Sequence, residues 1–173
     1  MEASNKFYAG IGSRETPPGV EPMIEEVAHF LGLFEYTLRS GAASGADSMF
    51  EKHCMYSKEI YLPWKGFNNN FSNLYLDNIN LDKVTEAREI AKEYHPSWSY
   101  LSEAAKKLMT RNTFQVLGED LKTPVSFIVC WTKGGKINGG TGQALRIAKG
   151  NFIPIFNLYN KDCLYKIKLH ITK

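Results

Sequence analysis

The feature that most constrains the fold is a unit that occurs three times: a short apolar run, a loop of small residues, and a helical pattern. The three loops are Gly10-Ile-Gly-Ser-Arg14, Ser40-Gly-Ala-Ala-Ser-Gly-Ala-Asp47 and Gly139-Gly-Thr-Gly142. Apolar strands that alternate with amphipathic helices form parallel sheets covered by helices on both faces. The loops that leave the carboxyl ends of such strands gather at one edge, where ligands bind. We therefore predict a Rossmann-like α/β fold with a mostly parallel sheet and a crevice built from these loops.

The spacing of apolar residues predicts the individual elements. Strands are expected at 7–9, 36–38, 58–62, 124–131 and 152–156, and helices at 20–31, 46–55, 81–94, 100–117 and just after residue 142. The run at 124–131 is almost continuously apolar, which is typical of a strand buried on both faces. Segment 68–80 is polar and irregular, which predicts a mobile loop. The apolar tail after Asn157 fits a helix or a strand.

Composition places the chain among globular proteins. Its 173 residues fit one domain spanning residues 1–173, and 43% are hydrophobic and 23% charged. We expect a cytoplasmic protein, because the sequence shows neither a membrane-spanning run nor an N-terminal targeting signal. The three scattered cysteines predict no disulfide framework, and we expect no metal and no cofactor. The net charge of +3 permits contact with phosphates without demonstrating a nucleic-acid surface.

The first loop is suited to an anion. Glycines at 10 and 12 allow close approach of the backbone, and the helix that follows presents free N–H groups at its start. The planar guanidinium of Arg14 can bind two phosphate oxygens at once. The alternative is that the glycines serve only the turn, since Pro17 and Pro18 interrupt the full G-x-G-x-x-G pattern.

The second loop holds six consecutive small residues, from Gly41 to Ala46. A turn usually needs only one or two such residues, so this run favours a ligand that lies flat against the backbone. Asp47 then either caps the helix that follows or hydrogen-bonds a sugar hydroxyl.

The helix predicted at 100–117 changes character along its length. An inward apolar stripe near its start continues into polar residues at the same spacing. Buried polar groups need partners, so this face either leaves the core or enters a polar site, and we favour the site. The stripe comprises Leu101, Ala104, Ala105 and Leu108, and the polar continuation comprises Arg111, Asn112 and Gln115.

Together the three loops resemble the signatures of the DNA-processing protein A (DprA/Smf) Rossmann domain. More broadly they are similar to the SLOG superfamily, which includes the LOG nucleotide phosphoribohydrolases. The resemblance covers most of the chain. The chain is also similar in size and form to small stand-alone members of the family that bacteriophages often encode, and such a member would be located in the host cytoplasm. The resemblance implies that the three loops bind nucleotides or single-stranded DNA. We do not expect the separate winged-helix region that some relatives carry.

The third loop departs from the LOG catalytic pattern P-G-G-x-G-T-x-x-E. The glycines match, but Asn138, Gln143 and Arg146 stand where the pattern has proline, threonine and the catalytic glutamate. An arginine cannot act as a carboxylate nucleophile or base. Glu51 is a possible substitute, although a surface carboxylate is the simpler interpretation.

The principal prediction is therefore a binding protein for a nucleotide or nucleotide-derived small molecule; a phage member would sequester a nucleotide signal made by host defence. Two alternatives stay open: single-stranded DNA binding, and an N-glycosidase of the phosphoribohydrolase type. In the DNA alternative, bases stack on Trp64, Phe67, Trp98 and Trp131, while Lys65, Lys133 and Lys136 meet phosphates.

The apolar tail is compatible with a homo-oligomer, and no membrane partner is expected. The predicted ligand-binding residues are Gly10, Gly12, Ser13, Arg14, Ser40, Gly41, Ala43, Ser44, Gly45, Asp47, Arg111, Asn112, Gln115, Trp131, Gly139, Gly140 and Thr141.

Overall fold

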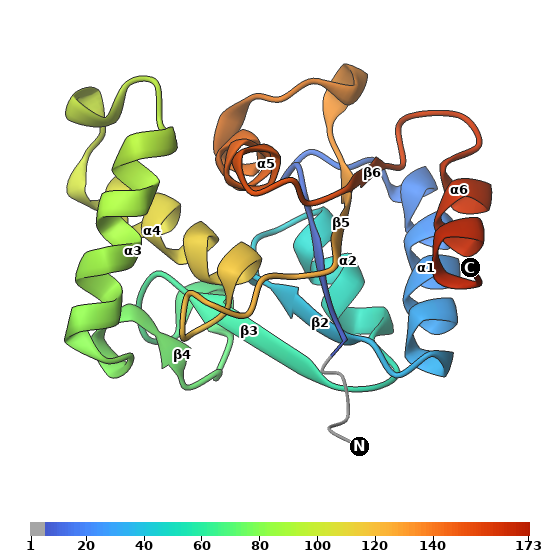
Figure 1. Ribbon diagram of the computed structural model, residues 1–173, viewed down its shortest axis with the longest axis horizontal. Helices are drawn as coiled ribbons and strands as arrows, with labels where there is room; N and C mark the ends of the chain where they lie inside the picture. The colour runs from blue at the N-terminus through green and yellow to red at the C-terminus, as the bar shows by residue number, and fades with distance from the viewer. Residues whose placement is uncertain (1–5) are drawn as a thin grey trace.

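A six-stranded parallel sheet forms the centre of the protein, seen in a computed structural model that describes residues 6–173 (Figure 1). Its strands lie in the order β4-β3-β2-β1-β5-β6, and every pairing within the described residues is parallel. This confirms the predicted Rossmann-like α/β class. The strands are β1 (Phe7–Gly12), β2 (Thr37–Ser40), β3 (Lys58–Leu62), β4 (Leu74–Tyr75), β5 (Phe127–Trp131) and β6 (Ile155–Asn157).

Within residues 6–173, six α-helices cover the sheet in two groups, one on each face (Figure 1). One face carries α1 (Glu21–Leu33), α2 (Ala46–His53) and α6 (Cys163–Ile171). The other carries α3 (Leu81–Tyr94), α4 (Glu103–Leu117) and α5 (Gly139–Gly150). None of the helices within residues 6–173 has the length and hydropathy that crossing a bilayer demands. The predicted absence of an N-terminal targeting signal concerns residues 1–5 in part. These residues lie outside the part of the chain that the structure describes.

The central strands bury both faces, as the apolar run predicts. All five residues of β5 are buried. Phe127 and Val129 pack against the α1, α2 and α6 side, whereas Ile128 and Cys130 pack against the α5 side. The alternation follows from the period of two in a strand, and it places a hydrophobic core on each face of the sheet.

Several boundaries differ from the sequence-based predictions. β1 continues through Gly10 to Gly12, because these residues pair with Val129 and Trp131 of β5. The glycines are therefore strand residues and not turn residues. Segment 68–80, predicted to be an irregular mobile loop, contains the two-residue strand β4, and the tail forms helix α6.

The predicted apolar stripe of α4 is wrong in its first half. The helix begins at Glu103, because Ser102 caps it by accepting a hydrogen bond from the Ala105 N–H. Ala104 is exposed, and Leu101, Ala105 and Leu108 are only half-buried. Every residue from 109 to 117 is buried. The helix thus enters the protein interior, and its polar residues lie in the more deeply buried half.

Candidate ligand-binding site

A cavity of about 460 Å³ lies where the loops after β1, β2 and β5 meet α4. This is the carboxyl-end position that the alternating sequence pattern predicts for a ligand crevice. Of the seventeen predicted site residues, the structure brings eleven together around the cavity. They are Gly12, Ser13, Arg14, Ala43, Asp47, Arg111, Asn112, Gln115, Gly139, Gly140 and Thr141.

The other six predicted residues do not line the cavity: Gly10, Ser40, Gly41, Ser44, Gly45 and Trp131. Ser40 is fully buried and its hydroxyl donates to the Gly10 carbonyl at 2.6 Å, which joins β2 to β1. The Trp131 ring is 8% exposed and packs edge-on against Tyr159. Ser44 is exposed on the surface. These positions serve the packing of the sheet edge or face solvent outside the cavity.

Close packing within the protein explains most of the loop glycines. A Cβ at Gly12 would lie 2.6 Å from both the Ala46 Cβ and the Trp131 carbonyl oxygen, so a side chain there would collide with α2 and β5. Gly45 has φ of +80° and faces the Ser13 carbonyl. In contrast, a Cβ at Gly140 would meet only the Met109 methyl group, at 3.7 Å. Gly139 and Gly140 are therefore the loop glycines that border open space at the cavity, since a Cβ at Gly139 would have no atom within 4 Å.

Asp47 ties the first two loops together. Its carboxylate accepts a hydrogen bond from the Gly12 N–H at 3.1 Å, and the residue is only 4% exposed. It does not cap α2, whose N-cap residue is Gly45, so the capping interpretation is wrong. Burial raises the pKa of Asp47 to about 6, although the positive charge of Arg111 and nearby backbone N–H groups oppose the rise.

The polar face of α4 forms the floor of the cavity. Arg111 donates to the Gly41 carbonyl and, at 3.3 Å, to the Tyr61 carbonyl, so it fastens α4 to the ends of β2 and β3. Its Nε–H also donates to Asn112, whose amide group donates in turn to the Gly140 carbonyl at 2.9 Å. Burial lowers the pKa of Arg111 to about 10. The positive charge of Arg14 lowers this pKa further, and the negative charge of Asp47 opposes the change. Arg111 stays a cation at neutral pH.

Gln115, one turn further along α4, differs from Arg111. It lines the cavity and is 2% exposed. Its Nε2 is the single buried side-chain nitrogen or oxygen without a hydrogen-bond partner in residues 6–173. An unpaired buried donor costs about 1–3 kcal/mol. This nitrogen is covered by the protein in the present side-chain position, and a rotation of Gln115 would turn it toward an acceptor on a ligand in the cavity.

The rim of the cavity is positive. The first turn of α5 borders it through Gly139, Gly140 and Thr141, and no side chain caps this helix start. Its unpaired N–H groups and the helix dipole favour an anion. Two cationic residues, Arg14 and Lys133, are exposed at the same rim together with one carboxylate, that of Glu15, so the side chains there keep a net positive charge.

The structure adds cavity residues that the loop motifs did not predict. They are Ile11, Glu15, Leu108, Met109, Thr132, Asn138 and Ala144. Thr132 follows the last residue of β5 and Ile11 is the penultimate residue of β1, so the positions of the strand ends offered a signal for both. Glu15 and Met109 carried no such signal, because their proximity depends on how the loop and α4 pack.

The position of the LOG catalytic glutamate is used for packing. Arg146 donates to the Tyr94 carbonyl at 2.9 Å and to the Gln143 side chain at 2.9 Å, and Gln143 donates to the Ala91 carbonyl at 2.8 Å. Both side chains thus join α5 to α3. Glu51 accepts hydrogen bonds from Lys58 and Asn70 and does not line the cavity.

The aromatic residues predicted to stack bases pack against protein groups. Phe67 is 8% exposed, and its ring meets the half-buried Trp64 at a centroid distance of 5.3 Å. Trp98 is half-buried, with Arg88 and Lys106 over its ring. None of the three lines the cavity.

The strand order and the cavity at the carboxyl ends define a Rossmann-like α/β protein. The chain is similar in structure to DNA processing protein A from Helicobacter pylori, which was solved to describe the single-stranded DNA binding mode of that protein. The TM-score is 0.57 at 18% sequence identity, over 96% of this chain and 73% of that chain. The predicted resemblance to the DprA fold is thereby confirmed. No protein-family model and no curated protein sequence matches the chain.

Proposed function

We propose that the cavity binds single-stranded DNA, with one nucleotide of the strand held between the loops after β1 and β5. The observation that carries this proposal is the positive rim formed by Arg14, Lys133 and the start of α5 above a polar floor. The fold shared with DNA processing protein A, whose solved structure concerns single-stranded DNA binding, supports the same conclusion.

The charges within the cavity suggest an orientation for the nucleotide. On the floor the carboxylate of Asp47 lies near the guanidinium of Arg111 and their charges offset each other, whereas the rim carries free positive charge that attracts a phosphate group. The phosphate therefore sits at the rim, and the sugar or base edge faces Gln115, whose side chain rotates so that Nε2 donates to an oxygen or ring nitrogen of the ligand. This arrangement pairs the buried donor and neutralises the phosphate.

Tyr159 is a better stacking residue than the tryptophans named above. It is 52% exposed, and its ring lies beside Gly135 in the loop that carries Lys133. Exposed aromatic rings next to cations are the usual platforms for bases of a single strand. We expect the neighbouring base to stack there.

Fluorescence anisotropy with a labelled thymidine oligonucleotide tests the proposal. If Arg14 and Lys133 each contact one phosphate, the slope of log affinity against log salt concentration is about −1.4. Arg14→Ala should weaken binding by about 1.5–3 kcal/mol and bring the slope to about −0.7. Arg88→Ala is the matched control, because Arg88 lies on α3 in an ion pair with Glu103 away from the cavity. An affinity that is independent of salt would refute the proposal.

A free nucleotide or nucleotide-derived molecule is the second candidate, and the buried polar floor favours it. A groove that only follows a DNA backbone has no need for Asp47, Asn112 and Gln115 beneath it, and a cavity of about 460 Å³ falls in the range for one small ligand. Calorimetry with mononucleotides, cyclic nucleotides and ADP-ribose separates the two candidates. Submicromolar binding of one nucleotide, together with displacement of the oligonucleotide, would identify the small molecule as the ligand.

A further inference from the structure

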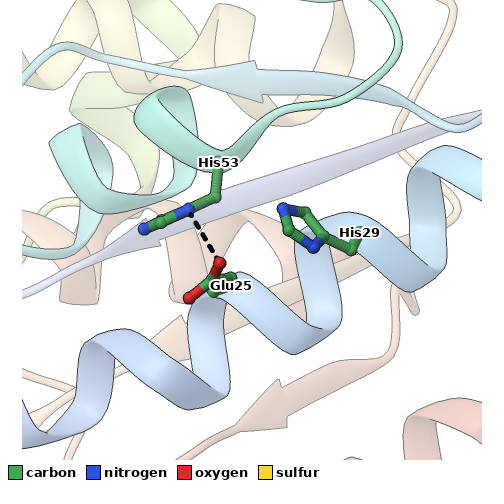
Figure 2. A group of neighbouring side chains, drawn as sticks. All are labelled: Glu25, His29 and His53. Atoms are coloured by element: carbon green, nitrogen blue, oxygen red, sulfur yellow. Dashed lines mark ion pairs between the residues drawn. The ribbon is translucent and has the colours of Figure 1, made fainter.

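Two histidines and a glutamate meet where α1 packs against α2 (Figure 2). This contact lies on the face of the sheet opposite α5. Glu25 and His29 lie one turn apart on α1, and His53 is the last residue of α2. Each offers one ligand atom, and these atoms all lie within 4.8 Å of one another. The His53 Nδ1 is 3.8 Å from a Glu25 carboxylate oxygen, and the two imidazole rings meet edge-on at a centroid distance of 6.0 Å.

A fourth side chain orients His53. The Nε2 of His53 lies 2.9 Å from a carboxylate oxygen of Glu21, which also accepts a hydrogen bond from Lys52 at 2.7 Å. An ionised carboxylate accepts and does not donate, so Nε2 carries the proton. The lone pair of the neutral imidazole is then on Nδ1, the atom that faces Glu25. A carboxylate that holds the far nitrogen of a histidine is the usual support for a metal-ligating histidine.

We propose that Glu25, His29 and His53 bind a divalent transition-metal ion of the zinc type. Two imidazole nitrogens and one carboxylate form a common ligand set for Zn²⁺, with water in the fourth position. Zinc bonds of about 2.0–2.1 Å in a tetrahedron place the ligand atoms about 3.3 Å apart. The ligand atoms would therefore move closer together by up to about 1.5 Å, which rotation of the exposed Glu25 and half-buried His29 side chains allows.

The presence of His29 distinguishes a metal site from a simple cluster of ion pairs at this position. Glu21, Lys52 and His53 already form a hydrogen-bonded surface group that needs no metal, but His29 is not required for it. Nitrogen ligands also disfavour Mg²⁺ and Ca²⁺, which prefer oxygen. The sequence alone did not predict the site, because His53 comes from a separate helix and the spacing matches no local metal motif.

Titration calorimetry of tag-free, metal-stripped protein with Zn²⁺ tests the proposal. We expect one saturable site with a dissociation constant below about 100 µM, and an affinity at least tenfold lower in His29→Ala. Glu21→Gln, which removes the carboxylate that orients His53, should lower zinc affinity about tenfold. His95→Ala is the control, because it removes a histidine outside the cluster, and its zinc affinity should equal that of the unaltered protein.

Two further measurements guard against nonspecific binding. Co²⁺ should give the visible absorption bands of a tetrahedral nitrogen–oxygen site, and these bands should be lost in His29→Ala. Zinc should raise the melting temperature of the unaltered protein and of His95→Ala but not of His29→Ala, because a ligand that binds only the folded state stabilises it. Absence of saturable zinc binding, or equal binding by His29→Ala, would overturn the proposal.

Discussion

At the scale of single residues, the loop glycines divide according to what surrounds them. A side chain at Gly12 would collide with α2 and β5, and one at Gly10 would lie 2.6 Å from the Phe50 ring. These residues are small because protein elements approach them closely. Gly140 borders the cavity and has space around it. Substitutions at the two kinds of glycine should therefore affect different properties.

We predict that Gly140→Ala keeps the fold and impairs the ligand site. The added methyl group replaces glycine in the first turn of α5, which favours the helix by up to about 1 kcal/mol, but it projects beside Met109 in the cavity. Oligonucleotide affinity should fall while the melting temperature is unchanged or raised. Gly45→Ala should instead lower the melting temperature, because φ is +80° and the Ser13 carbonyl is close. A loss of stability in Gly140→Ala without a loss of affinity would contradict the assignment.

Asp47 should make the protein less stable as the pH rises from about 4 to about 6. Burial raises its folded-state pKa to about 6, whereas an aspartate in an unfolded chain has a pKa of about 3.9. Between these values the folded state keeps a proton that the unfolded chain releases. The free energy of unfolding therefore decreases with rising pH, by up to about 3 kcal/mol from this group.

Urea unfolding at pH 4, 5, 6 and 7 measures this effect against Asp47→Asn. The asparagine keeps an oxygen for the Gly12 N–H and does not titrate. The stability of the unaltered protein relative to the variant should fall across the window and level off above pH 6. A difference that is constant with pH would show that Asp47 titrates as it does in water.

At the scale of elements, α4 combines structural and ligand-binding roles on one buried face. Arg111 fastens the helix to the strand ends through the carbonyls of Gly41 and Tyr61. Gln115 has an unpaired Nε2 at the cavity. Removing the polar side chain should therefore lower the stability of the fold at Arg111, whereas at Gln115, one turn further along α4, it should mainly lower ligand affinity.

We predict that Arg111→Ala destabilises the fold by about 1–3 kcal/mol, because buried carbonyl groups lose their donor. Gln115→Leu should leave stability unchanged or raise it, since it removes an unsatisfied donor, and should weaken ligand binding. Thermal melts and anisotropy titrations on the two variants check this contrast. Normal affinity in Gln115→Leu would place the ligand away from the floor of the cavity.

The elements that the sequence predicted well are those with an unambiguous apolar period. β3 and α3 have the predicted bounds of 58–62 and 81–94, and α3 starts where Asn80 caps it. The two residues of β4 are too few to show a pattern, and the apolar residues of α6 fit the period of a helix and that of a strand equally well. Local spacing identifies an element only when the element is long enough to repeat the spacing.

The candidate site was predictable to the extent that topology dictates it. Strand ends bring Gly12, Asp47 and Gly139 to one edge whatever the details of packing. Asp47 accepts a hydrogen bond from the Gly12 N–H, and Arg146 joins α5 to α3 through the Tyr94 carbonyl. In both contacts the two partners are more than thirty residues apart in the sequence. Such contacts leave no local trace in a single sequence.

At the scale of the whole molecule, the centre of the sheet joins distant parts of the chain. β1 pairs with β2 on one side and with β5 on the other, with Tyr8 opposite Phe127 and Gly12 opposite Trp131. A fragment that ends at residue 123 lacks β5, β6, α5 and α6, so one edge of β1 and one flank of each core lose their cover.

We predict that this 123-residue fragment unfolds without a cooperative transition and binds a hydrophobic dye, in contrast to the complete chain. Exposed strand edges and apolar surface also favour aggregation, which light scattering would detect. A soluble fragment with a sharp melting transition would show that the first four strands form a stable unit.

The position of β1 between β2 and β5 also has a consequence for synthesis. About 120 residues separate the paired segments of β1 and β5, so at about 5–20 residues per second the ribosome needs roughly 6–24 s to supply the partner of β1. During that interval the nascent chain has a hydrophobic strand with one open edge. Chaperones that hold emerging chains should therefore be engaged from the first strand until the fifth leaves the exit tunnel.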